Sequence, residues 1–319
     1  MGHTASTLLT VTGYFLLVAL GAWAGSRRAV RSSTFGWMSP LQTALLLIII
    51  LALGIQLGAN EEVASSLGMI GLSATLIAVL AMLGSILFLM LLRVFALRLD
   101  RRALPRDAAE TSRTEEESAD HTLTWMISAV VILGFALGRW ILPNSVSSRC
   151  GTVVTIGLDG MLFLVGLDLG RQGEAISSVR SAGKGALLVP AAVVSGSLLF
   201  GALAGLILPI SPRETAAVAA GMGWYSLAPT ILAPYSLKLS AVAFLANVLR
   251  EILSILLIPS VAHRLGYLEC VAAAGATAMD TVLPVIVRAT SRRMTIYAFA
   301  SGLVCSLLVP LLVPLIAGI

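Results

Sequence analysis

The chain has 319 residues, of which 58% are hydrophobic and only 12% are charged, and its mean hydropathy is +0.96. Soluble globular domains carry about 25% charged residues, so this composition excludes an ordinary soluble enzyme and also intrinsic disorder. Apolar stretches of about 20 residues recur along the chain, and each is long enough to cross a bilayer as a helix. These features predict an all-α polytopic membrane protein that lies in the lipid bilayer.

Cysteine and histidine are too few and too scattered to form a metal or haem site. The chain holds three of each, namely Cys150, Cys270, Cys305, His3, His121 and His263. None has the spacing of a ligand set, so neither a metal nor a cofactor is expected. The formal net charge of +5 is interpreted as basic residues at the cytoplasmic lipid surface, not as a nucleic-acid-binding surface.

About eight apolar segments are expected to cross the membrane as helices. In chain order they are 7–25, 40–58, 68–92, 123–142, 152–170, 184–209, 239–261 and 294–317. Two further apolar stretches, about 214–236 and 269–290, are interrupted by Gly, Pro and polar residues. The one long polar stretch, 98–121, mixes arginines with glutamates and is interpreted as a solvated linker in preference to a binding tail.

The basic residues between the spans indicate the orientation of the chain. Lys and Arg number 3, 0, 6, 1, 3 and 1 in the first six loops. Because cytoplasmic loops carry the excess of Lys and Arg, the first, third and fifth loops are predicted to be cytoplasmic. Both termini are then predicted to lie outside.

An internal repeat divides the N-terminal part of the chain. Residues 54–88 align with residues 166–200 at a fixed offset of 112, with 13 identities in 35 ungapped positions. The matches include a glutamate and a pair of serines, which are uncommon in membrane segments. The predicted units are a first three-span repeat over 1–97, the charged cytoplasmic linker over 98–121, a second, inverted three-span repeat over 122–210 and a C-terminal unit over 211–319.

The charge count gives the two three-span repeats opposite orientations. Inverted-topology repeats are characteristic of secondary transporters, because two mirrored halves can form two similar gated states. An ancient duplication in a channel or a membrane enzyme is the alternative interpretation.

The two interrupted stretches resemble each other. At an offset of 55, Ser226-x-x-Pro229 aligns with Thr281-x-x-Pro284, and one apolar span follows each stretch. A helix that faces lipid cannot leave backbone groups unpaired, so we predict two re-entrant or discontinuous helices inside the protein. Half-helix ends supply partial charges to ions and to substrate carboxylates. Two kinked helices without a ligand are the alternative.

Two carboxylates are expected inside the membrane. Glu251 lies in the span 239–261 and Asp280 lies in the second interrupted stretch. A carboxylate at mid-membrane costs about 2.5–3.5 kcal/mol on insertion scales, so it usually faces a cavity, pairs with a cation or takes up a proton. Asn247 shares the helix face of Glu251, whereas Arg250 is about 100° away around the helix. A structural Arg–carboxylate pair is the alternative.

Three other acids are less informative. Asp159 and Asp168 are nine residues apart in one span, on roughly opposite faces, and Asp168 is close to the cytoplasmic end. Glu61, next to Glu62, is placed at a predicted outer mouth, where it is suited to attract cations. An ordinary solvated loop is the alternative for that position.

Three C-terminal motifs resemble the bacterial and archaeal lysine exporter (LysO) family. They are Gly223-Trp224-Tyr225-Ser226, Phe244-Leu245-Ala246-Asn247-x-x-Arg250-Glu251 and Gly275-Ala276-Thr277-x-Met279-Asp280-Thr281-x-Leu283-Pro284. The segments 54–58 and 166–170 also resemble that family, so the resemblance covers about 40–319. Some members carry Asp where this chain has Asn247, and the first span and the 98–121 linker have no counterpart in the pattern.

The resemblance implies a polytopic inner-membrane exporter of L-lysine and related basic amino acids, driven by proton antiport. It implies that the intramembrane acids are needed, and these map onto Glu251, Asp280 and a position near Glu61. A carboxylate also suits the substrate's ε-ammonium, and backbone N–H groups at a broken helix suit its α-carboxylate. One acid that binds either a proton or the ammonium gives obligatory exchange. The expected site residues are Glu251, Asp280, Asn247, Trp224, Tyr225, Ser226, Arg250, Thr281 and Glu61.

Other functional classes stay open at this point. Trp224 and Tyr225 are suited to pack on a cation, but packing beside a kink explains them equally well. The alternatives are a channel, which would pass substrate without counter-transport, and an antiporter of other amino acids or ions. An intramembrane hydrolase would need Ser226 with His263 as its base, and His263 is expected at the far end of its span, so we do not expect an enzyme. The sequence is compatible with a homodimer.

Overall fold

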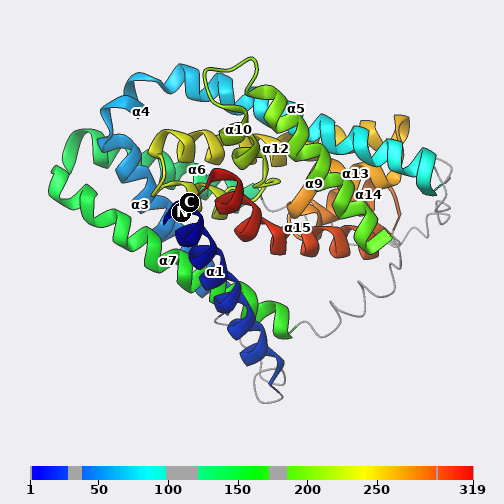
Figure 1. Ribbon diagram of the computed structural model, residues 1–319, viewed down its shortest axis with the longest axis horizontal. Helices are drawn as coiled ribbons and strands as arrows, with labels where there is room; N and C mark the ends of the chain where they lie inside the picture. The colour runs from blue at the N-terminus through cyan, green and yellow to red at the C-terminus, as the bar shows by residue number, and fades with distance from the viewer. Residues whose placement is uncertain (1, 28–37, 98–120, 172–184, 292–293, 319) are drawn as a thin grey trace.

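The computed structural model describes residues 2–27, 38–97, 121–171, 185–291 and 294–318, and helices are the only regular elements in those ranges (Figure 1). Nearly all of the predicted 98–121 linker lies outside them. The N-terminal half comprises α1 (Gly2–Ser26), α3 (Met38–Ala59), α4 (Glu61–Ser65), α5 (Leu67–Leu92), η1 (Arg93–Leu97), α6 (His121–Ala136), η2 (Leu137–Ile141) and α7 (Asn144–Arg171). The C-terminal half comprises α9 (Gly185–Ala204), α10 (Pro212–Ala219), α11 (Leu227–Leu232), α12 (Leu237–Arg264), α13 (Tyr267–Ala274), η3 (Gly275–Met279), α14 (Leu283–Ala289) and α15 (Met294–Ala317).

Six helices in the described ranges are long and apolar enough to cross a membrane, namely α3, α5, α7, α9, α12 and α15. They coincide with six of the eight predicted spans. Shorter apolar helical segments, Thr12–Ser26 and Ala129–Ile141, lie at the other two predicted spans. The prediction of an all-α polytopic membrane protein is therefore confirmed.

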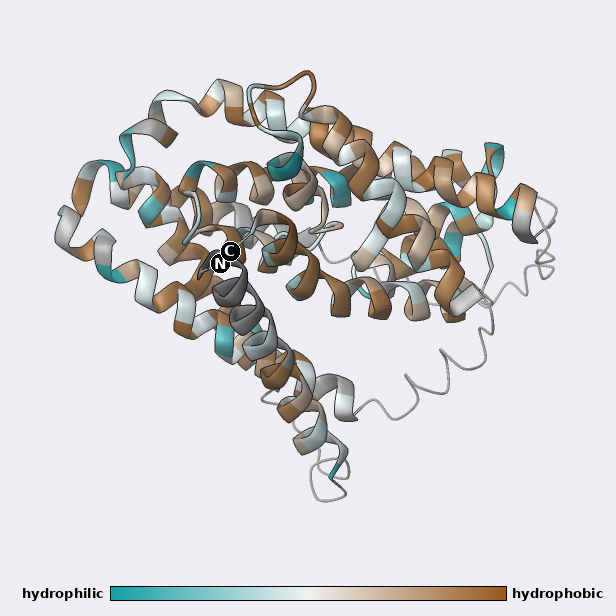
Figure 2. Ribbon diagram, viewed as in Figure 1, coloured by the Kyte–Doolittle hydropathy of each residue, from teal (hydrophilic) through white to brown (hydrophobic). Residues whose placement is uncertain are grey.

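The outer surface of the helices is apolar, as a lipid environment requires. Large aliphatic side chains such as Leu72 on α5, Ile156 on α7 and Leu187 on α9 are exposed. Figure 2 shows apolar residues along most of each helix, with hydrophilic residues concentrated at helix ends and between helices. The buried interior is also mostly apolar, and a smaller set of buried polar residues lies within it.

Glycines allow several helices to pack closely in pairs. α1 packs along α7, α3 packs along α6, and α5 crosses α9. A Cβ atom on Gly21 of α1 would meet the backbone of α7, and one on Gly138 of η2 would meet the backbone of α3. Gly84 of α5 and Gly196 of α9 face each other, and a Cβ on either would meet the carbonyl oxygen of the other. Small residues permit such backbone contact between membrane helices.

The C-terminal unit contains the most buried part of the protein. α10 and α13 each have eight residues and begin 55 positions apart. All residues in 215–223 and 266–278 are buried. α12, which is 28 residues long, separates the two segments in the chain and packs against α10, α11, α13 and α14. These contacts place the two interrupted segments on one central helix.

Candidate substrate site

The backbone is interrupted in both segments where the sequence predicts it. Residues 220–226 separate α10 from α11, and the 3-10 helix η3 with a turn at 280–282 separates α13 from α14. Met222, Gly223 and Gly275 have φ angles of 48°, 99° and 66°, a region that glycine adopts without steric cost. The N–H of Ala276 donates to the carbonyl of Met222 at 2.9 Å. The two interruptions therefore meet directly.

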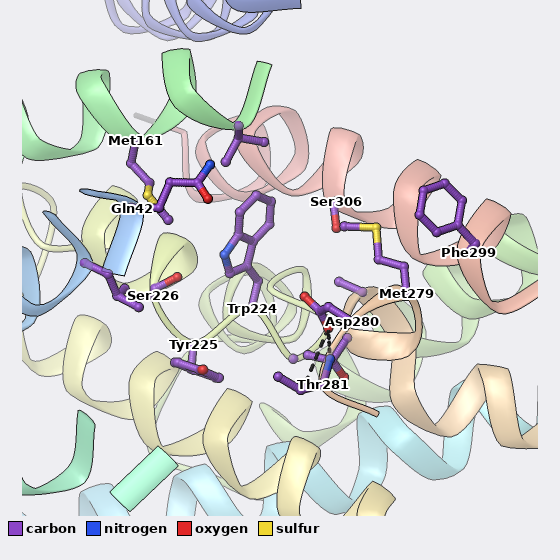
Figure 3. Close-up of a pocket in the computed structure, with 15 residues that line it drawn as sticks. Gln42, Met161, Trp224, Tyr225, Ser226, Met279, Asp280, Thr281, Phe299 and Ser306 are labelled. Atoms are coloured by element: carbon purple, nitrogen blue, oxygen red, sulfur yellow. Dashed lines mark hydrogen bonds between the residues drawn. The ribbon is translucent and has the colours of Figure 1, made fainter. Parts of the chain in front are cut away.

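A pocket of about 340 Å³ lies between the two interruptions. From the first it is lined by Gly223, Trp224, Tyr225 and Ser226, and from the second by Ala276, Thr277, Met279, Asp280 and Thr281. The remaining walls come from α3, α7 and α15 and comprise Gln42, Leu46, Met161, Val165, Phe299 and Ser306. Figure 3 shows the Trp224 indole at the centre of the pocket. Gln42 of α3 and Met161 of α7 lie on one side of it, and Asp280 lies on the other. Asp280 is the one charged residue in this lining.

Asp280 presents its carboxylate to the pocket from the turn after η3. Its Oδ1 accepts the N–H of Thr281 at 2.6 Å and lies 3.3 Å from the Thr281 hydroxyl oxygen. The residue is exposed to the pocket. Within the described ranges, no arginine or lysine forms an ion pair with it. Its second oxygen is therefore placed to accept a donor from a bound molecule.

Glu251 lies behind this layer on α12 and is 3% exposed. Its carboxylate lies within reach of the Thr281 hydroxyl and close to the carboxylate of Asp280, and the Tyr225 phenol is also nearby. A threonine hydroxyl has a single proton to donate, so Thr281 can serve one of the two carboxylates at a time. Thr281 therefore links Glu251 to the acid that borders the pocket.

Asn247 holds the first interruption in place without lining the pocket. Its Oδ1 accepts the N–H of Gly223 at 2.7 Å, and its Nδ2 donates to the carbonyl of Ala243 at 2.8 Å and to that of Val218 at 3.4 Å. The amide accepts the Gly223 N–H, a donor that the interruption frees in the buried backbone, and donates to carbonyls of α10 and α12. Its contacts therefore position Gly223 beside the pocket.

Arg250 points away from the pocket and is 2% exposed. Its guanidinium donates to the Oγ atoms of Ser197 at 2.8 Å and Ser85 at 3.0 Å. It also donates to the carbonyls of Ala273 at 3.3 Å and Ala272 at 3.2 Å, in the last turn of α13. A cation stabilises the C-terminal end of a helix. Arg250 thus binds the end of α13 to α5 and α9, and no hydrogen bond to Glu251 is found within the described ranges.

The other predicted polar residues are not brought to the pocket. Glu61 is exposed at the start of the short helix α4 and does not line the pocket. The sequence had suggested either a cation-attracting outer mouth or an ordinary solvated loop at this position. Asp159 is half-buried on α7, close to Tyr14, and the side chain of Asp168 is outside the described part. His263 is exposed in the last turn of α12 and does not line the pocket that Ser226 borders.

Sequence reasoning missed several polar residues of the interior. Ser85 and Ser197 were visible as an identical pair in the repeat, but nothing in the sequence pointed to Arg250 as their partner. Gln42 of α3 borders the pocket and donates to the carbonyl of Leu164 at 3.4 Å. Glu269 is completely buried on α13 and pairs with Arg93. These contacts join segments far apart in the chain, which local patterns do not reveal.

Comparison with known proteins points to one family. The family model described as "Lysine exporter LysO" matches residues 128–317. The chain is 29% identical over 279 residues to the Escherichia coli K12 protein "Lysine exporter LysO", which covers 86% of this chain and 89% of that protein. It is 31% identical over 192 residues to a "Putative lysine exporter" of Haemophilus influenzae, covering 59% of this chain and 94% of that protein. No solved structure matches the chain.

Proposed function

Because the chain belongs to the lysine exporter LysO family, we propose that it exports L-lysine and related basic amino acids from the cell in exchange for protons. The single observation that carries the site assignment is the Asp280–Thr281–Glu251 arrangement beside a pocket formed by two interrupted helices. The pocket presents one carboxylate and, from the described ranges, no basic side chain, which suits a cationic substrate.

The packing supports an inverted-repeat architecture with eight spans, in which α1, α3 and α5 correspond to α6, α7 and α9. The α1–α7 contact through Gly21 corresponds to the η2–α3 contact through Gly138. Gly84 and Gly196, which are equivalent at the offset of 112, touch each other. Equivalent residues meet in this way only near an axis that relates two copies, and such an axis in the membrane plane is typical of secondary transporters.

The C-terminal unit supports two hairpins that enter from opposite sides. Tyr235 donates to Glu214 at 3.5 Å, so the end of α11 lies beside the start of α10. Arg213 donates to the carbonyl of Ile316 at 2.5 Å, so the end of α15 lies on that side too. α13 begins at the other end of α12, about 42 Å away along a helix of this length. The α10–α11 and α13–α14 hairpins are proposed to meet at mid-membrane.

The basic loops orient this architecture in the inner membrane. Most Lys and Arg residues lie in the first, third and fifth loops, which places 98–121 in the cytoplasm and both termini outside. The same rule places the Arg93 end of α5 at the cytoplasmic side. Substrate would then approach the pocket from the end at which α13 begins.

Coupled exchange of lysine for protons follows if the carboxylates of Glu251 and Asp280 bind either protons or the substrate ammonium, but not both at once. Exporting a monocation from a cell that is negative inside costs about 2.3 kcal/mol per 100 mV. Inward movement of one proton cancels this electrical term and leaves the pH gradient as the driving force. The backbone of the interruptions, with Trp224 over the cation or its aliphatic stem, would complete the site.

Lysine efflux from proteoliposomes tests the proposal. Vesicles loaded with labelled lysine are assayed with and without an imposed inward pH gradient. The antiporter accelerates efflux only with the gradient and acidifies the lumen in proportion to the lysine released. A channel would release lysine equally in both conditions, and a protein without this function would release none.

A further inference from the structure

A buried ion pair joins the end of α5 to the start of α13. The Nε of Arg93, in η1, donates to Oε1 of Glu269 at 2.6 Å, and the two side chains are 5% and 0% exposed. A terminal nitrogen of Arg93 also points to the carbonyl of Leu265 at 3.4 Å. Neither charged residue borders the pocket. The pair therefore fixes α13 against α5 at one end of the protein.

Only one of the two carboxylate oxygens of Glu269 accepts a hydrogen bond in the described ranges. Its Oε2 atom is buried and has no hydrogen-bond partner in the described ranges. An ionised carboxylate can accept donors at both oxygens, and the guanidinium fork is able to fill both at once. Here Nε contacts one oxygen alone. Because a buried charged group with an unfilled acceptor is costly, the arrangement leaves Glu269 with capacity for a second cationic donor.

The equivalent position in the other hairpin shows that a buried pair is not required by the fold. Glu214 lies 55 residues before Glu269, also in the first turn of its helix. Its carboxylate accepts the N–H and the hydroxyl of Ser211 at 3.1 and 2.7 Å at the protein surface. Gly205 stands at the position that corresponds to Arg93 at the offset of 112. The ion pair is therefore a feature of one side only.

Glu269 is also connected directly to the pocket wall. α13 continues from Glu269 into η3, whose residues Ala276, Thr277 and Met279 line the pocket. Gly275 is six positions after Glu269, which is about 9 Å along a helix. Movement of α13 away from α5 would therefore have two effects at once. It would expose Glu269, and it would displace the part of η3 that lines the pocket.

We propose that Glu269 is a loading site for the side-chain cation of the basic amino acid, and that Arg93 occupies it while this side of the protein is closed. This inference rests on the proposed function. The guanidinium of Arg93 is a cationic N–H donor, as are the guanidinium of arginine and the ammonium of lysine, so a carboxylate that binds one of these cations can exchange it for another. Entry of the substrate cation on the Arg93 side replaces Arg93, and the pair forms again once the substrate has moved to the pocket.

The test compares lysine efflux by variants in proteoliposomes in which the Arg93 side of the protein is exposed to the lumen. The luminal lysine concentration is varied. The variants are Glu269→Gln and the double variant Arg93→Gln with Glu269→Gln, with Glu214→Gln as the matched control in the other hairpin. The single variant leaves Arg93 without its counter-ion, whereas the double variant replaces the pair by two neutral amides that can bind each other. The double variant is therefore decisive, and its melting temperature without lysine is measured in parallel.

We expect the double variant to fold and to raise the half-saturating lysine concentration about tenfold, the loss that accompanies one charge-assisted hydrogen bond. Its maximal rate should stay close to that of the wild type, and Glu214→Gln should change neither quantity. A wild-type half-saturating concentration in the double variant, with efflux otherwise intact, would overturn the loading site and leave the proposed function standing. Absence of lysine efflux from wild-type vesicles would count against the proposed function and this inference together.

Discussion

Ser85 and Ser197 occupy equivalent positions in the two repeats, and both accept a hydrogen bond from the guanidinium of Arg250, at 3.0 and 2.8 Å. They follow Gly84 and Gly196, which bring α5 and α9 into backbone contact. One cation is thus held by the same residue of each copy, at the point where the copies meet. Because Arg250 also binds carbonyls in the last turn of α13, it connects α5 and α9 to the second interruption, and it does not line the pocket.

Removing the serine hydroxyls tests this connection. Ser85→Ala and Ser197→Ala should each lower the stability of the folded protein by about 1.5–3 kcal/mol, because each leaves a buried guanidinium donor without its acceptor. Thr75→Ala is the control, since the Thr75 hydroxyl is exposed on the same helix as Ser85 and bonds only to its own turn. Thermal unfolding of the purified variants measures the effect. Equal melting temperatures for Ser85→Ala and Thr75→Ala would show that the hydrogen bond from Arg250 to Ser85 does not stabilise the fold.

The close contact of α5 with α9 should tolerate no side chain. Gly84→Ala places a methyl group against the carbonyl of Gly196 and the side chain of Phe200, so the helices must separate. We expect a loss of about 1–3 kcal/mol, as for other overpacked interiors. Gly71→Ala on the same helix meets nothing within 4 Å and should be neutral or slightly stabilising. The comparison requires only expression level and melting temperature, and an equally tolerated Gly84→Ala would show that the two helices do not rely on this contact.

Asn247 should resist replacement by aspartate in this chain. Asn247→Asp keeps the oxygen that accepts from Gly223 but replaces the amide nitrogen, which donates to Ala243 and Val218, by a second acceptor. We expect a loss of about 1–3 kcal/mol and slower lysine efflux, because a second acceptor then faces two buried carbonyl oxygens in place of a donor. Efflux and melting temperature are measured together. Full activity with unchanged stability would show that Asn247 does not hold the first interruption.

The orientation of the chain can be tested by labelling a single position. Ala108→Cys lies in the 98–121 linker, which the distribution of basic residues predicts to be cytoplasmic. The native cysteines Cys150, Cys270 and Cys305 are buried, so they give little background. A membrane-impermeant thiol reagent should label Ala108→Cys only after the cells are opened. Labelling of intact cells would reverse the proposed orientation.

The positions of the apolar helices and of both interruptions could be predicted from the sequence. Long apolar runs set the spans, and the glycines and prolines at 220–229 and 275–284 locate the interruptions, because both signals are local. Trp224, Ser226 and Asp280 were predicted to belong to one site, and the structure brings them to one pocket.

The tertiary partners of the charged residues could not be predicted. Arg250 was expected among the site residues as part of the motif that also holds Glu251, yet its guanidinium bonds to α5, α9 and α13. Glu269 lies in an apolar stretch, and its partner Arg93 precedes it by 176 positions. Such pairings depend on how helices pack, and a sequence without related sequences beside it carries no direct record of that packing.

The central claim is that Glu251 holds the exchangeable charge of the transporter. Glu251→Gln preserves the size of the side chain and its ability to bond Thr281, so the variant should fold and show a melting temperature near that of the wild type. It cannot exchange a proton for the substrate ammonium, so proton-coupled lysine export should be lost.

The most direct measurement is lysine efflux from Glu251→Gln proteoliposomes under an imposed pH gradient, with Glu214→Gln as a control whose carboxylate lies at the surface. The account predicts that the gradient no longer accelerates efflux in Glu251→Gln, while Glu214→Gln responds as the wild type does. Gradient-driven export at the wild-type rate by folded Glu251→Gln would contradict it.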